Sequence, residues 1–188
     1  MSERTNRIRA FVRGEWGCVS HGGRTAADHC LGVGALLEEA GAQEQLVHAG
    51  LMHVIYGAES YPGLEDKVGD CDASLLTAEE RALIHHYSRV SEKSLSIAGI
   101  TSNPGFLRDR DQDDPLEFSR EESKHVCLLL LVNILEQFLA EPDNPIFQAQ
   151  RNDLARPLAG LAQISGEIGM RIYAMAYHDH KINNGSTA

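Results

Sequence analysis

Apolar residues recur at helical spacing in the strongly patterned segments of this chain. In one segment, Ala26, Cys30, Val33 and Leu37 fall on one face of a helix. From Leu46 to Tyr56 almost every residue is apolar, which is typical of a central helix surrounded by neighbours. Because every strong period is helical, the chain is predicted to be all-α.

Capping signals predict where the helices begin and end. Thr25 is placed to cap a helix that Gly41 ends, and capping-box spacing occurs at 77–80 and 119–122. The expected helices cover residues 4–15, 26–40, 46–56, 77–92, 124–140 and 152–176. Residues 60–74 and 100–118 are expected to be loops.

The length of 188 residues is enough for one hydrophobic core. No linker or internal repeat divides the chain. We therefore expect an N-terminal helix within residues 1–19, one helical domain over 20–180 and a flexible tail over 181–188.

Charge and cysteine usage limit the partners. Seventeen basic and 27 acidic residues give a net charge of −10, which disfavours nucleic acid and anionic membranes. No signal peptide is evident, no apolar run is expected to span a bilayer, and the four cysteines form no CxxC pair, so a reducing cytoplasm is expected. A small-molecule substrate is the expected partner, with a homo-oligomer as an option for assembly.

Three polar residues stand out inside apolar helical stretches: His29 at the edge of a buried stripe, His53 in a buried helix, and Asn133 in a third. Neutral imidazole is the commonest transition-metal ligand, and bundle cores hold metals between facing helices. A buried histidine can equally be a hydrogen-bonded core residue. Two on neighbouring helices make a shared site a serious alternative.

The order of these residues resembles the HD superfamily, which includes alarmone and nucleotide phosphohydrolases and a smaller group of di-iron oxygenases. The match runs from His29 through Ala-Gly-Leu-Met-His53 to Asn133. It implies an HD-like single-domain helical bundle with a shared core over roughly residues 21–140, His29 as the first metal ligand and His53 as the histidine of the His-Asp pair. A closer likeness is to an uncharacterised branch, with Ser20-His21-Gly-Gly-Arg24-Thr25 and an Ala-Gly-Leu-x-His-x-x-Tyr-Gly segment.

The chain departs from the HD pattern at its carboxylates. Val54 stands in place of the aspartate of the pair, and Asn133 in place of the late aspartate. The Glu-Asp of alarmone hydrolases is replaced by the segment 55–58. These departures favour oxygenation or another tailoring reaction over phosphohydrolysis.

The predicted site has three metal ligands, His21, His29 and His53, around one Fe, Mn, Cu or Zn ion. His85 or His86 is a further candidate ligand, and adjacency on a helix allows at most one of them to face the site.

Other side chains are expected to bind or react with substrate. Arg24 and Asn133 are predicted to bind it, Tyr56 to donate a hydrogen bond and Glu59 to move a proton, beside His53 as a catalytic residue. The expected function is that of a divergent HD-like enzyme acting on a small organic molecule. The alternatives are a metal-free small-molecule-binding domain and a metal-free acid–base catalyst.

Overall fold

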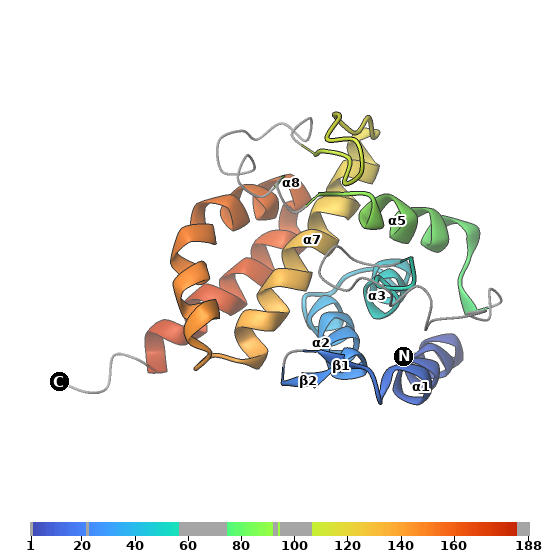
Figure 1. Ribbon diagram of the computed structural model, residues 1–188, viewed down its shortest axis with the longest axis horizontal. Coiled ribbons are helices and arrows are strands. Elements are labelled where there is room, and N and C mark those ends of the chain that lie inside the picture. Colours follow the sequence, from blue (N-terminus) through green and yellow to red (C-terminus); the bar gives the residue numbers. More distant parts are fainter. Residues whose placement is uncertain (1, 22, 57–74, 92–93, 95–106, 184–188) are drawn as a thin grey trace.

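The computed structural model describes residues 2–21, 23–56, 75–91, 94 and 107–183, and it is an all-α single domain (Figure 1). A short antiparallel hairpin, in which two-residue strands β1 and β2 pair, leads into the second helix. The elements are α1 (Glu3–Trp16), β1 (Ser20–His21), β2 (Arg24–Thr25), α2 (Ala26–Glu39), α3 (Glu44–Leu51), α5 (Ala78–Ser88), α7 (Arg120–Ala140) and α8 (Pro145–Asn183).

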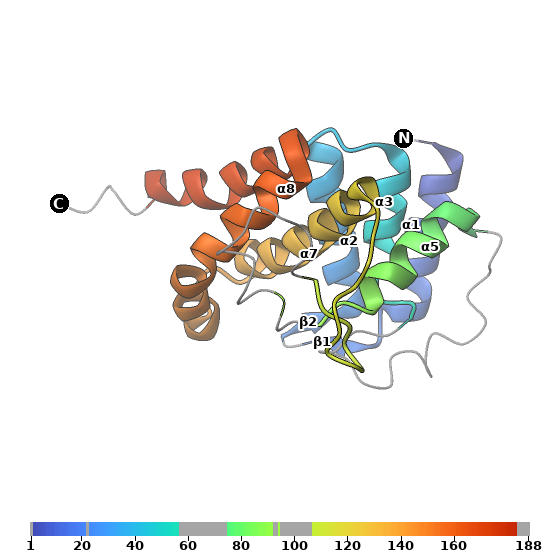
Figure 2. The ribbon, with the colours of Figure 1, turned by 90° about the horizontal axis from the view of Figure 1, so that it is seen from above.

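Helix α7 is the centre of the fold. It packs against α8 on one side and against α2, α3 and α5 on the other (Figures 1 and 2). The sequence analysis expected no membrane-spanning run, but the length and apolarity of α7 satisfy the composition criteria for one. However, 61% of its most apolar stretch lies buried inside the protein. Core helices of globular domains share these properties, so the test is weak evidence here.

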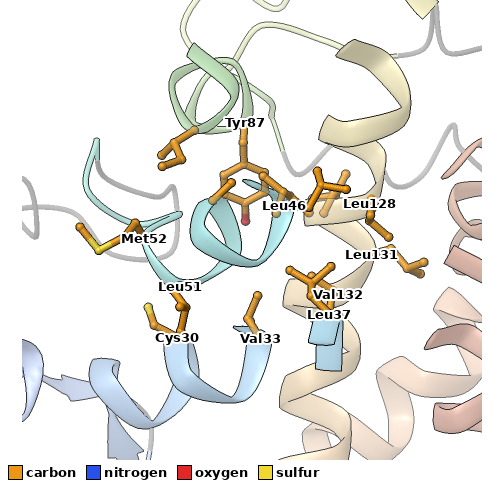
Figure 3. Close-up of a cluster of buried hydrophobic side chains, with 14 of the residues drawn as sticks. Cys30, Val33, Leu37, Leu46, Leu51, Met52, Tyr87, Leu128, Leu131 and Val132 are labelled. Atoms are coloured by element: carbon orange, nitrogen blue, oxygen red, sulfur yellow. The ribbon is translucent and has the colours of Figure 1, made fainter. Parts of the chain in front are cut away.

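Two glycines let α2 and α3 approach each other closely. A Cβ atom on Gly34 would lie 2.5 Å from Leu51 Cδ2, and one on Gly50 would lie 2.4 Å from Leu37 Cδ1. Both leucines are fully buried, and Figure 3 shows them in the cluster between α2, α3 and α7. Any larger side chain at either glycine would have to displace packed core atoms.

Helix α8 is broken at Gly166, whose φ of 76° lies in the left-handed region that favours glycine. The two halves lie antiparallel and are joined by side-chain bonds to backbone carbonyls. Tyr173 Oη donates to Ala155 O at 3.2 Å, and Tyr177 Oη donates to Arg151 O at 3.0 Å. The segment therefore forms a helical hairpin.

A buried polar network ties α1 to α3 and α5. Arg4 Nη2 donates to Glu80 Oε1 at 2.7 Å, and the same oxygen lies 2.8 Å from His48 Nδ1. Thr5 Oγ1 donates to Glu44 Oε1 at 2.8 Å and lies 2.9 Å from His48 Nε2. Since the hydroxyl proton goes to Glu44, His48 donates from Nε2 to Thr5.

The six predicted helices are present, and the boundaries of four of them need correction. The helix predicted over 46–56 ends at Leu51, so His53 lies in the turn that follows. The helix predicted to reach residue 92 ends at Ser88, and the helix predicted to begin at residue 124 begins at Arg120. The last helix, predicted over 152–176, runs from Pro145 to Asn183. Proline suits a first helical position because its missing N–H is not needed there.

The remaining predictions on chain organisation concern segments that the structure covers only in part. The predicted loop 60–74 and the end of the predicted tail, 184–188, lie outside the described residues. The short β1–β2 hairpin was not predicted, because two-residue strands carry no period to detect.

Glu80→Ala is expected to lower the free energy of unfolding by about 3 kcal/mol, because it leaves Arg4 and buried His48 without their carboxylate. The measurement is chemical denaturation of both proteins. Glu79→Ala on the same helix turn is the control, since Glu79 is exposed, and it should change stability little. Equal effects of the two substitutions would contradict a structural role for the network.

Candidate functional site

His29 lies in the first turn of α2 and is 1% exposed. Its helix begins at a capping box, in which the Thr25 and Asp28 side chains each accept a hydrogen bond from the backbone N–H of the other residue. This reciprocal cap fixes the start of the helix and thereby the direction in which His29 leaves it. The side chain points into the core, toward α3 and α7.

His53 reaches the same place from the turn after α3. Its Nδ1 lies 2.7 Å from the carbonyl oxygen of Gly50, a group that only accepts, so Nδ1 carries a proton and donates it. The ring meets the rings of His29 and Tyr87 edge to face, with centroids 5.1 Å and 5.5 Å away. These contacts hold the imidazole in one orientation.

Three side-chain atoms from three elements converge, and we call their residues, His29, His53 and Asn133, the histidine–amide cluster. His29 Nε2 lies 3.3 Å from His53 Nε2 and 2.8 Å from Asn133 Oδ1. His53 Nε2 lies 3.0 Å from the same amide oxygen. The sequence analysis predicted that these residues share a pocket, and the structure brings them together.

A carboxylate lies behind the cluster. Glu136 Oε2 is 2.6 Å from His29 Nδ1, and Glu136 Oε1 accepts a hydrogen bond from Arg24 Nη2 at 2.7 Å. Glu136 is 4% exposed, so its negative charge is paired with Arg24 inside the protein. An ionised carboxylate only accepts, which places the proton of a neutral His29 on Nδ1.

The inner atoms of the cluster can all be hydrogen-bond acceptors. With both imidazoles neutral and protonated on Nδ1, each Nε2 presents a lone pair, and Asn133 Oδ1 presents a third. Three acceptors at about 3 Å repel one another unless a cation, a proton or a donor lies among them. The geometry therefore favours positive charge or an N–H donor at the centre of the cluster.

Four of the predicted site residues lie together in the structure. His29, His53 and Asn133 meet, and Arg24 joins them through Glu136. Glu59 and the side chain of His21 lie outside the described part of the chain, so their predicted roles stay predictions.

The aromatic candidates lie farther out. Tyr56 is 38% exposed, and its ring meets that of His85 with centroids 5.7 Å apart. His86 packs on Phe118. The aromatic residue of α5 that contacts His53 is Tyr87, which was not among the predicted site residues.

Glu136 was missed in the sequence analysis. It is three residues after Asn133, the spacing that places two side chains on one face of a helix, but a glutamate near a helix end reads as solvated. His48 was missed too, although it lies in the same apolar segment as His53.

Residues 13–92 match the model of a domain of unknown function, DUF6817. The DUF6817 segment carries His29 and His53, while Asn133 and Glu136 lie beyond it. Searches of curated proteins and of solved structures found no match.

The inner atoms of the histidine–amide cluster suit a transition metal in type and spacing. Two ligands that each lie about 2.1 Å from one ion at roughly right angles are ~3.0 Å apart, close to the separations in the cluster. Within the described residues, no group of three or more His, Cys, Asp or Glu side chains could hold a metal ion. A metal here would use two imidazoles and an amide oxygen.

Cys30, the residue after His29, is not suited to join that set. Burial, reinforced by the negative charge of Glu136, raises the pKa of the Cys30 thiol well above its ordinary value. Because a thiolate is the form that binds metals, the protonated thiol behaves as a small apolar side chain.

The tautomer of His53 can be tested directly. In metal-free protein at neutral pH, His53 is expected to carry its proton on Nδ1, because the Gly50 carbonyl accepts it. Two-bond proton–nitrogen correlation spectra, with His53→Gln to assign the resonances, measure this. A proton on Nε2 alone would contradict the assignment.

Proposed function

We propose that this protein is a divergent HD-like enzyme that transforms a small organic molecule at a single transition-metal site built on His29 and His53. Oxygenation or another tailoring reaction is favoured over phosphohydrolysis. The observation that carries the proposal is the convergence of two imidazole nitrogens and one amide oxygen within 3.3 Å of one another.

Each residue of the cluster has a defined task in this proposal. His29 and His53 offer Nε2 lone pairs because their Nδ1 protons are held by Glu136 and Gly50 O. Asn133 adds a neutral oxygen in place of its predicted role in substrate binding, and His21 remains the third predicted histidine ligand. A bound Fe, Mn, Cu or Zn ion would activate water or oxygen at the remaining positions.

The replaced carboxylates support the choice of reaction. Val54 is 2% exposed and buried in the core, so no acidic group acts from that position. Asn133 supplies an amide where HD phosphohydrolases have an aspartate. A neutral ligand set lacks the carboxylate ligands of those enzymes, and it resembles the histidine-rich sites that bind redox-active metals.

A second candidate is a metal-free pocket that binds a small molecule or acts by acid–base catalysis. Rotating the Asn133 amide by half a turn would place its NH₂ group between the two imidazoles, and one nitrogen has enough hydrogens to donate to both. This arrangement closes the cluster without a cation. It predicts a stable site with no affinity for metals.

Metal analysis tests the first candidate. Protein purified without a metal-affinity tag is expected to contain about one transition-metal ion per chain, and His29→Ala and His53→Ala are each expected to lose it. His85→Ala is the control, because this exposed side chain packs on Tyr56 outside the cluster. Elemental analysis of the four proteins gives the answer. Native protein without metal, even after reconstitution with iron, manganese, copper or zinc, would contradict the proposal.

Asn133→Asp separates the two candidates. A carboxylate binds cations more strongly than an amide oxygen, so the affinity for Zn²⁺ or Mn²⁺ should rise about tenfold or more by titration calorimetry. Under the metal-free candidate the substitution removes the NH₂ donor. Metal affinity would then stay absent, and thermal stability would fall.

A further inference from the structure

We propose that Glu136 is a positioning residue that sets the metal affinity of the cluster by holding the His29 imidazole in one tautomer and one orientation. The inference rests on the proposed function for its effect on metal binding. Its structural part, the control of the His29 tautomer, is independent of any metal.

Residues of α7 lie at both ring nitrogens of His29. Asn133 Oδ1 is 2.8 Å from Nε2, and Glu136 Oε2 is 2.6 Å from Nδ1. Because these two residues are three positions apart on one helix, they face α2 together. The ring cannot rotate or exchange its nitrogens without losing its hydrogen bond to Glu136.

The two oxygens of Glu136 have different tasks. Oε2 accepts the His29 Nδ1 proton, and Oε1 accepts from Arg24 Nη2 at 2.7 Å. Arg24 lies on β2, next to the Thr25 cap of the helix that carries His29. The guanidinium therefore fixes the carboxylate from the same segment that positions the imidazole.

Gly32 provides the space that Glu136 occupies. A Cβ atom on Gly32 would lie 2.2 Å from Glu136 Oε1 and 2.8 Å from its Cδ. Gly32 is one turn after His29 on α2, so the carboxylate lies against bare backbone at this point. The missing side chain at Gly32 therefore makes room for the Glu136 carboxylate in particular.

Charge adds to orientation. A carboxylate bonded to the outer nitrogen of a metal-binding histidine raises the basicity of the inner nitrogen, and loss of such a partner typically lowers metal affinity by about 10- to 100-fold. In the described part of the cluster the three inner donors are neutral, and Glu136 is the carboxylate in contact with one of them. Its negative charge therefore contributes directly to cation binding.

The first experiment measures the His29 tautomer in metal-free protein by two-bond proton–nitrogen correlation. Wild type is expected to show the proton on Nδ1. Glu136→Gln should keep it there, because the amide oxygen still accepts, whereas Glu136→Met should produce a mixture of tautomers. An unchanged, single Nδ1–H tautomer in folded Glu136→Met would overturn the proposal.

The second experiment measures Zn²⁺ and Mn²⁺ affinity of the same variants by titration calorimetry. Glu136→Gln is expected to lower affinity about 10-fold and Glu136→Met about 100-fold. If Glu136 only stabilises the fold, thermal stability falls while affinity and tautomer stay at wild-type values, and the proposal is wrong. Failure of wild type to bind any metal would instead contradict the proposed function, leaving the tautomer result to decide the role of Glu136.

Gly32→Ala tests the role without altering Glu136 itself. The added methyl group should push the Glu136 carboxylate away from His29. The His29 tautomer and the metal affinity of this variant are therefore expected to change in the same direction as in Glu136→Met. Gly14→Ala on α1 is the matched control, because a Cβ there meets nothing within 4 Å. Wild-type behaviour of folded Gly32→Ala in both measurements would count against the proposal.

Discussion

The close approach of α2 to α3 is the constraint on which the rest of the site depends. Without side chains at Gly34 and Gly50, the helices pack with Leu51 and Leu37 pressed against bare backbone. This packing brings His29, near the start of α2, within 3.3 Å of His53, just after the end of α3. Helix α7 then supplies Asn133 and Glu136, the polar side chains that face the two histidines.

The described part of the protein contains two Arg–Glu–His chains, which differ in what faces the second nitrogen of the histidine. In the first, Arg4 and Glu80 face one nitrogen of His48, and the other nitrogen donates to the Thr5 hydroxyl, which donates onward to Glu44. Both ring nitrogens of His48 and the Thr5 hydroxyl have hydrogen-bond partners. The network is complete without a ligand, as expected of a connection between helices.

In the second chain, Arg24 and Glu136 face one nitrogen of His29, but the other nitrogen faces two further acceptors, His53 Nε2 and Asn133 Oδ1. With both imidazoles protonated on Nδ1 and the Asn133 oxygen turned inward, the three described atoms that meet here are all acceptors. A cation, a proton or a rotated Asn133 amide can each stabilise this arrangement.

Much of the fold follows from local sequence signals. The boxes that open α2, α5 and α7 involve residues three positions apart, and the apolar stripe from Ala26 to Leu37 defines one face of α2. The errors arise where tertiary contacts compete with helix propensity. The apolar run after Leu51 could continue the helix, but the bond from His53 Nδ1 to Gly50 O belongs to a turn.

The sequence predicts only those site residues that stand out as polar side chains within apolar, buried segments. His29, His53 and Asn133 interrupt apolar patterns, so their convergence was predictable. Glu136 follows an apolar run instead of interrupting it. Nothing in the neighbouring sequence shows that α2 lacks a side chain opposite Glu136. The relevant signal is Gly32, a hundred residues away, and it acquires meaning only when the two helices are packed together. A carboxylate that acts through a histidine is therefore found by accounting for both ring nitrogens, a step that requires the folded structure.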